Sequence, residues 1–233
     1  MPLTAKEDGH HHWTYAGSEG PERWGDLSKE YATCKIGQNQ SPVDIPVKLQ
    51  PGSGTIETHY DETYYKLENN GHTLQASVGE KAPTMVVDGN VFTLKQFHFH
   101  TPSEHTFKGE HYPMEIHFVH QSSEKALAVL AVVVKEGAEN PDFTPLIEKN
   151  LKAGEKETAG KLLNVARLIP NDSTHFRLTG SLTTPPCSEG VSWIIFETPI
   201  TASKAQIDAM RAMTGSNNRP VQPLNSRTVA KDN

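Results

Sequence analysis

The most constraining feature of this chain is a polar–apolar alternation with a period of two in residues 96–100 and again in residues 115–120. This is the period of a β-strand, in which successive side chains point to opposite faces. The 16 residues that separate His100 from His117 leave room for the two strands to pair as antiparallel neighbours. One face of the pair would then carry Gln96, His98, His100, Glu115 and His117.

Short strands and turns are indicated along the rest of the chain. Asn70-Gly71 and Asp88-Gly89 are turn signals beside alternating segments, and the apolar run 126–135 is typical of a strand buried on both faces. We expect strands over 64–68, 73–78, 84–87, 91–94, 126–135, 176–178 and 191–197. We expect helices over 142–152, 161–168 and 203–213, the last with a Ser N-cap and Gly215 just beyond it. Without a repeat or linker, residues 1–233 indicate one mainly β (β-rich α+β) domain, with 1–12 as a flexible extension.

The composition excludes several classes of function. A net charge of −6 without a basic block argues against nucleic-acid binding. No apolar run approaches the roughly 20 residues that span a bilayer, so we expect no membrane segment. The polar N-terminus lacks the apolar core of a signal peptide, which leaves a cytosolic protein or a mature chain with an added Met. Cys34 and Cys187 leave two buried free thiols as one interpretation, and we assign no role to the cluster His10–His12.

The three histidines of the polar face are a candidate metal site. His98 and His100 lie two residues apart on a strand, close enough to share an ion, and His117 on the neighbouring strand completes the set. Three imidazoles favour zinc and leave its fourth position open, where the pKa of a bound water falls to about 7. Gln96 and Glu115 are placed to orient the neighbouring histidines by hydrogen bonds.

A His-X-His pair alone is weak evidence for a metal. The whole polar face is stronger evidence, because unpartnered polar groups in an apolar core are costly and such a face must line a cavity or hold an ion. His105, His111 and His120 fit the set less well. Because His120 lies on the opposite face from His117, we expect it to be a hydrogen-bonded core histidine.

Seven motifs follow one another along the chain: Gln-Ser-Pro-Val-Asp-Ile (40–45), Asn-Gly-His (70–72), Gln-Phe-His-Phe-His (96–100), Ser-Glu-His-Thr (103–106), Glu-Ile-His-Phe-Val-His (115–120), Ser-Leu-Thr-Thr-Pro-Pro (181–186) and Arg-Pro-Val-Gln-Pro-Leu-Asn (219–225). In this order they resemble the α-class carbonic anhydrases of the bacterial secreted type, from Trp13 to Arg227. The resemblance implies a large central, mostly antiparallel twisted sheet with short peripheral helices. It also implies a zinc lyase that reversibly hydrates CO₂ to bicarbonate and a proton, with weak esterase activity.

The resemblance assigns roles to individual residues. It implies that zinc is bound by His98, His100 and His117, and that these are oriented by Gln96, Glu115 and a backbone carbonyl near Asn217. Thr183 would accept the proton of zinc-bound hydroxide and donate to Glu104, which directs the hydroxide at CO₂. His72 would be the proton shuttle, since an imidazole titrates near neutral pH. Substrate would be met by the Thr183 backbone N–H, by Thr184 on a polar wall, and by an apolar CO₂ pocket of Val119, Val129, Leu182, Val191 and Trp193. From sequence alone, ordinary core packing is the better explanation of those five apolar residues.

Cys34 and Cys187 match the disulfide of the secreted members. A disulfide implies an oxidising compartment, the periplasm or the exterior of the cell, and hence removal of a signal peptide. The resemblance also implies cis peptide bonds before Pro42 and Pro186. The partner would be the small molecule CO₂ or bicarbonate, and because bacterial members are often dimers the resemblance leaves a homodimer open.

Two alternatives remain for the same residues. Some related domains have lost zinc ligands and act as interaction modules, but this chain keeps all three histidines together with Glu104 and Thr183. A cupin-type metal oxygenase generally has a carboxylate ligand, and none stands at a suitable position here. Metal analysis and a CO₂ hydration assay distinguish these three interpretations.

Overall fold

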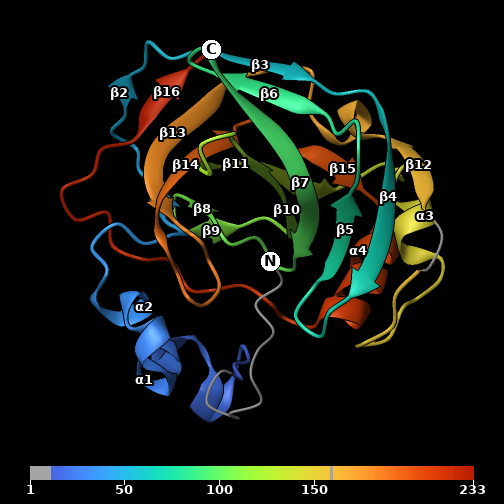
Figure 1. The fold of residues 1–233 in the computed structure, drawn as a ribbon, viewed down its shortest axis with the longest axis horizontal. Coiled ribbons are helices and arrows are strands. Elements are labelled where there is room, and N and C mark those ends of the chain that lie inside the picture. Colours follow the sequence, from blue (N-terminus) through green and yellow to red (C-terminus); the bar gives the residue numbers. More distant parts are fainter. Residues whose placement is uncertain (1–11, 158–159) are drawn as a thin grey trace.

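The computed structural model describes residues 12–157 and 160–233, so His10 and His11 of the histidine cluster lie outside it. A 13-stranded sheet dominates these residues, with the main order β12-β4-β5-β7-β10-β11-β14-β13-β16-β2 (Figure 1). Most neighbours are antiparallel, and β11 is parallel to β14 and β15. The expected mainly β fold around a mostly antiparallel sheet is therefore confirmed.

The strands are β1 (Asp44–Ile45), β2 (Gln50–Pro51), β3 (Ile56–His59), β4 (Glu62–Asn69), β5 (Leu74–Val78), β6 (Thr84–Val87), β7 (Asn90–His100), β8 (Thr106–Phe107), β9 (Glu110–His111), β10 (Met114–Gln121), β11 (Leu127–Glu136), β12 (Lys161–Asn164), β13 (His175–Ser181), β14 (Glu189–Phe196), β15 (Ile200–Ala202) and β16 (Ala230–Asp232). The α-helices are α1 (Trp24–Leu27), α2 (Thr33–Ile36), α3 (Thr144–Ile147) and α4 (Lys204–Thr214). No helix in the described part of the chain has the length and apolar character needed to cross a bilayer.

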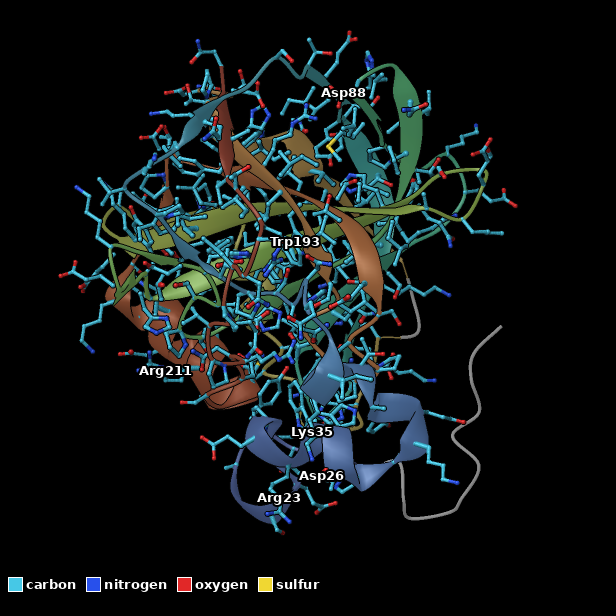
Figure 2. The ribbon with its side chains drawn as sticks, turned by 90° about the vertical axis from the view of Figure 1, so that its left-hand side faces the viewer. Arg23, Asp26, Lys35, Asp88, Trp193 and Arg211 are labelled. Carbon is cyan, nitrogen blue, oxygen red and sulfur yellow. A yellow bond between two sulfur atoms is a disulfide. The ribbon has the colours of Figure 1, made fainter. Side chains whose placement is uncertain are left out.

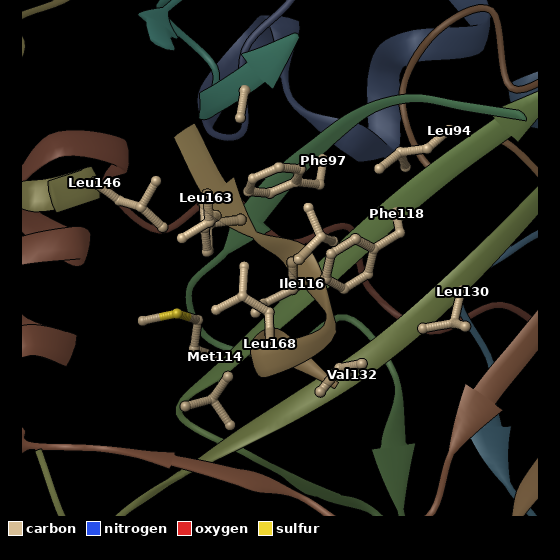
Figure 3. Close-up of a cluster of buried hydrophobic side chains, with 14 of the residues drawn as sticks. Leu94, Phe97, Met114, Ile116, Phe118, Leu130, Val132, Leu146, Leu163 and Leu168 are labelled. Carbon is tan, nitrogen blue, oxygen red and sulfur yellow. The ribbon is translucent and has the colours of Figure 1, made fainter. Parts of the chain in front are cut away.

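Strand β11 shows why the sheet has two apolar layers. Residues 128–134 are buried without interruption, as the apolar run predicted. Its even-numbered residues join the larger core, where Phe97, Ile116, Phe118 and Leu130 lie together (Figure 3). Val129 and Ala131 join a smaller cluster around Trp193 on the other face. The polar set of Gln96, His98, His100, Glu115 and His117 lies on this second face.

One turn places a functional segment at the start of a strand. Between β4 and β5, the Asn70 side chain accepts hydrogen bonds from the backbone N–H groups of His72 and Thr73, both at 2.9 Å. Gly71 adopts a φ of 86°, in the left-handed region that favours glycine. This turn fixes His72 at the start of the strand beside β7.

Two of the three helix predictions are wrong in most of their length. In 142–152 only α3 is helical, because the chain turns at Asn150, whose φ of 46° is incompatible with a continuing helix. Residues 161–168 form β12 and then one 3₁₀ turn, Val165–Leu168. The backbone of β12 forms its hydrogen bonds with β4. This long-range pairing overrides the local helix propensity of residues 161–164. Helix α4 is confirmed, with a capping box formed by Ser203 and Gln206 and with Gly215 at its C-terminal end.

The N-terminal segment contains α1, α2 and several 3₁₀ turns, and it packs beside the sheet (Figure 2). Trp24 is fully buried there, in edge-to-face contact with Trp13 and Tyr15. Cys34 in α2 forms a disulfide with Cys187, as the resemblance implied. The segment is thus joined covalently to the loop after β13. The peptide bonds before Pro42 and Pro186 are cis, as expected, and so is the Thr101–Pro102 bond, which was not predicted.

Candidate metal centre

Antiparallel pairing of β7 with β10 brings the three predicted histidines together. His117 lies opposite His98, and Glu115 lies opposite His100. One ring nitrogen from each of His98, His100 and His117 lies within 4.8 Å of the other two. His98 is half-buried, whereas His100 and His117 are almost completely buried.

Hydrogen bonds on the outer side of each ring determine which nitrogen faces the centre. The Nδ1 atom of His98 lies 2.7 Å from Gln96 Oε1, which leaves Nε2 for an ion. The Nδ1 atom of His100 lies 2.7 Å from the carbonyl oxygen of Asn217, which again leaves Nε2. His117 is held the other way round, with Nε2 against the Glu115 carboxylate and Nδ1 free. In metal sites, contacts of this kind fix the orientation of an imidazole ligand and determine which nitrogen faces the metal.

Electrostatics favours ligand-competent forms of these groups. Burial lowers the pKa of His98 well below its usual value and also lowers that of His100, so both rings are neutral near pH 7. Burial would raise the pKa of Glu115, but its contacts with His105 and His117 outweigh this and hold the pKa well below the usual range. A neutral imidazole is the form that binds metal.

Glu104 is fully buried behind the histidines. Its Oε2 atom accepts a hydrogen bond of 2.7 Å from the backbone N–H of Arg219. Its Oε1 atom has no hydrogen-bond partner and lies 3.4 Å from His100 Nε2, which also has none. Two buried polar atoms without partners, beside three converging imidazole nitrogens, fit a bound cation such as zinc.

Thr183 lies in the loop after β13 and is 5% exposed. The expected hydrogen bond from Thr183 to Glu104 is not formed in this structure, since Glu104 Oε1 has no partner and Oε2 is bound by Arg219. The loop itself is held by the Cys187 disulfide and by the Gln40 side-chain N–H, which donates to the Cys187 carbonyl. Thr184, next in the loop, is half-buried.

The expected CO₂ pocket residues belong to the smaller apolar cluster. Val129, Val191 and Trp193 are buried in it, and Val119 and Leu182 pack against it half-buried. The Trp193 ring lies 4.9 Å from the His117 ring, centroid to centroid. The structure therefore places an apolar wall directly beside the histidine centre.

His72 is half-buried and lies outside the histidine cluster. Its ring stacks on the Trp13 ring with centroids 3.7 Å apart and planes 8° from parallel. Burial lowers the pKa of His72, and the neighbouring His12 adds to the effect. This contact between Trp13 and His72 was not predicted from the sequence.

The remaining histidines have other partners. His105 is buried, and both its backbone N–H and its Nδ1 atom contact Glu115, at 2.9 and 2.8 Å. His111 is exposed, with Nδ1 2.7 Å from the Ser103 carbonyl oxygen. His120 is fully buried between the Tyr60 hydroxyl and the Ala128 carbonyl, so the prediction of a hydrogen-bonded core histidine is confirmed.

Sequence reasoning missed the extent of the tail's contribution. The Asn217 side chain accepts from Thr101 N–H and donates to the carbonyls of His72 and Phe99, while its own carbonyl holds His100. These bonds link the His72 turn to a histidine strand. Asn217 and Arg219 lie about 100 residues from their partners, and no periodicity or spacing in the sequence indicates such contacts.

Comparisons with known proteins agree with one another. The family model for eukaryotic-type carbonic anhydrase matches residues 19–233. A carbonic anhydrase of Klebsiella pneumoniae is 46% identical over 233 residues, covering 98% of this chain and 93% of its own length. The solved α-carbonic anhydrase of Photobacterium profundum is 44% identical, with a TM-score of 0.88 over 94% of this chain and 100% of its own. A hyperthermostable carbonic anhydrase from a hydrothermal vent chimney is 48% identical, with a TM-score of 0.88 over 95% of this chain and 100% of its own.

Proposed function

Because this chain belongs to the α-class carbonic anhydrase family, a family of lyases, we propose that it holds zinc and reversibly hydrates CO₂ to bicarbonate and a proton. The observation that carries the proposal is the convergence of three imidazole nitrogens beside an apolar wall. The fit is chemical as well as geometric, since each ring has an outer hydrogen-bond acceptor and an inner nitrogen without one.

In this proposal His98 Nε2, His100 Nε2 and His117 Nδ1 are the zinc ligands. Bound zinc would act as a Lewis acid that generates a nucleophile from water at neutral pH. Neighbouring residues fix the orientation of the ligand rings. The Gln96 side chain holds His98, and the Glu115 carboxylate holds His117. The Asn217 carbonyl does the same for His100.

Glu104 and Thr183 would direct the nucleophile. Glu104 Oε1 is buried without a partner and is therefore available to accept the Thr183 hydroxyl proton. Thr183 Oγ1 would then act only as an acceptor, which selects one orientation of the attacking group. The Thr183 backbone N–H would face the substrate oxygen, and Thr184 would line the polar wall of the site.

CO₂ offers little to hydrogen-bond, which suits the apolar side chains beside His117. The pocket that we propose is formed by Val119, Val129, Leu182, Val191 and Trp193. The proton released in the reaction would pass to the His72 ring and from there to buffer. Burial lowers the pKa of His72, which favours release of the proton from the ring at neutral pH.

The same centre would hydrolyse activated esters weakly, since they too are attacked at a carbonyl carbon. The Cys34–Cys187 disulfide supports a periplasmic or secreted location, where such bonds persist. Every residue of the proposed site comes from one chain, so the mechanism does not require the homodimer that remains open.

The test combines zinc analysis with stopped-flow CO₂ hydration. We expect one zinc per chain and rapid hydration in the parent protein. His117→Ala should lose zinc and activity together, because two imidazoles remain where three are needed. His111→Ala is the matched control, since His111 is an exposed histidine outside the centre and its removal should leave both intact. Full hydration activity in His117→Ala would refute the ligand assignment, and a parent protein with neither zinc nor activity would refute the function.

A further inference from the structure

Arg219 is among the largest fully buried side chains, and none of the roles described above uses its guanidinium group. It is 2% exposed and stands in the tail two residues after Asn217. A buried cation is costly unless its N–H groups find acceptors, so the partners of this group are informative.

The guanidinium of Arg219 binds two segments of the N-terminal region, one at Gln40 and Ser41 and the other at Cys34. Its Nη1 atom donates to Gln40 Oε1 and to the Ser41 carbonyl, both at 2.9 Å. Its Nη2 atom donates to the Cys34 carbonyl at 3.0 Å, and the group lies 5.7 Å from the centre of the Trp24 ring. Burial lowers the pKa of Arg219 to about 10, which still leaves the group charged at neutral pH.

The backbone of the same residue holds Glu104. The N–H of Arg219 donates to Glu104 Oε2 at 2.7 Å, and this is the carboxylate's one hydrogen bond within residues 12–157 and 160–233. The other oxygen, Oε1, consequently points at the centre, 3.4 Å from His100 Nε2 and 3.8 Å from His117 Nδ1. The direction of Glu104 therefore depends on where the Arg219 backbone lies, and the guanidinium determines that position.

We propose that Arg219 is a positioning residue for CO₂ hydration, which acts by fixing the Glu104 carboxylate against the metal centre and so orienting Thr183. The inference rests on the proposed function. Among the described residues, the hydrogen-bond partners of the Arg219 side chain are Gln40, Ser41 and Cys34, and none of them is a zinc ligand or a pocket residue in this proposal. Its acceptors at Cys34, Gln40 and Ser41 make the N-terminal segment part of the support of the site.

The test compares Arg219→Met with Arg227→Met. Arg227 is a matched control because it lies in the same tail and donates to four carbonyls, those of Leu224, Thr179, Gln40 and Pro223, without reaching Glu104. We expect kcat of Arg219→Met to fall by about 10- to 100-fold, since a misplacement of about 1 Å in a site can cost that much. KM should stay within about twofold, because the apolar pocket is untouched. Arg227→Met should keep the parent kcat even if it lowers stability.

A crystal structure of each variant gives a readout independent of turnover. In Arg219→Met we expect the Glu104 carboxylate to have moved from its position beside His100, and in Arg227→Met to be unmoved. Should Arg219→Met fail to fold, Arg219→Lys replaces it, since Lys keeps the charge but cannot reach all three acceptors. Zinc content is measured throughout, to separate loss of metal from loss of orientation.

The outcomes are distinct. Unchanged kcat, or an unmoved Glu104, in a folded Arg219 variant overturns the inference. Guanidinium added at low concentration should restore part of the kcat of Arg219→Ala, because a cavity of about 320 Å³ lined by Cys34 and Arg219 gives it access, and absence of any rescue would count against the role. Lack of hydration by the parent protein would instead refute the proposed function, and the position of Glu104 in the variant would still decide the structural claim.

Discussion

The burial of His120 makes a testable prediction about how the stability of this fold depends on pH. It is fully buried at the end of β10, where the pairing with β7 is irregular between Val119 and His120. The Tyr60 hydroxyl contacts its Nε2 atom, and its Nδ1 atom lies 3.3 Å from the Ala128 carbonyl oxygen. Burial lowers the pKa of His120 from 6.5 to about 4. The ring is therefore neutral in the folded protein under conditions in which the unfolded chain is protonated.

The sign and size of the effect on stability follow from proton binding. Below pH 6.5 the unfolded chain binds a proton at residue 120 that the folded chain does not, so acid favours unfolding until pH falls to about 4. At 1.36 kcal/mol for each unit of pKa, the full loss is about 3 kcal/mol. Most of this is lost between about pH 7.5 and about pH 4.5.

Urea unfolding followed by tryptophan fluorescence at the two pH values measures this loss. His120→Gln removes the titration while keeping a side chain that can donate and accept hydrogen bonds, so its unfolding free energy should fall by about 2 to 3 kcal/mol less than that of the parent chain over this interval. Tyr60→Phe is the control: it removes a hydrogen bond, at a cost of about 1 kcal/mol, but leaves His120 buried and able to titrate. Equal acid-dependent losses in the parent chain and His120→Gln would refute the reasoning.

Three further predictions concern the site and its supports. Glu115→Gln should weaken zinc binding by about 10- to 100-fold in a chelator competition, because the carboxylate orients His117, and unchanged affinity would contradict that role. His72→Ala should slow CO₂ hydration in weak buffer and recover with added imidazole; an undiminished rate would mean that protons leave by another route. Joint replacement of Cys34 and Cys187 by Ser should lower the unfolding free energy by about 5 kcal/mol, the loop-entropy value for a separation of 153 residues, and a loss below about 1 kcal/mol in urea titrations would show that the bond does not constrain the unfolded chain.

Sequence reasoning predicted the parts of the fold and site that follow from a local pattern of polar and apolar residues. The period-two pattern of β7 and β10 placed the three histidines on one face, and the apolar run correctly predicted that β11 is buried on both sides. The family motifs supplied the disulfide, which no spacing could have shown. Residues 161–164 were misassigned because their strand exists only through pairing with β4, almost 100 residues earlier.

The same reason explains what was missed in the site. The hydrogen bonds of Asn217 and Arg219 join residues more than 100 positions apart, so no local pattern encodes them. The expected contact between Thr183 and Glu104 depends on side-chain rotation, which the motifs do not determine. A family motif therefore predicts which residues lie near one another more reliably than it predicts the hydrogen bonds between their side chains.

The tail that contains Asn217 also bears on how the protein is made. Its carbonyl holds His100, and two residues later the backbone holds Glu104, so the histidine strands lack two of their supports until residues 217–219 have been synthesised. During synthesis, more than 90 residues would be added after the third imidazole, that of His117, before the segment that supports the site is present. Because metal binding and folding are coupled, tight zinc uptake should require the segment from Asn217 to Arg219, and chains truncated before Asn217 should compete poorly for the ion.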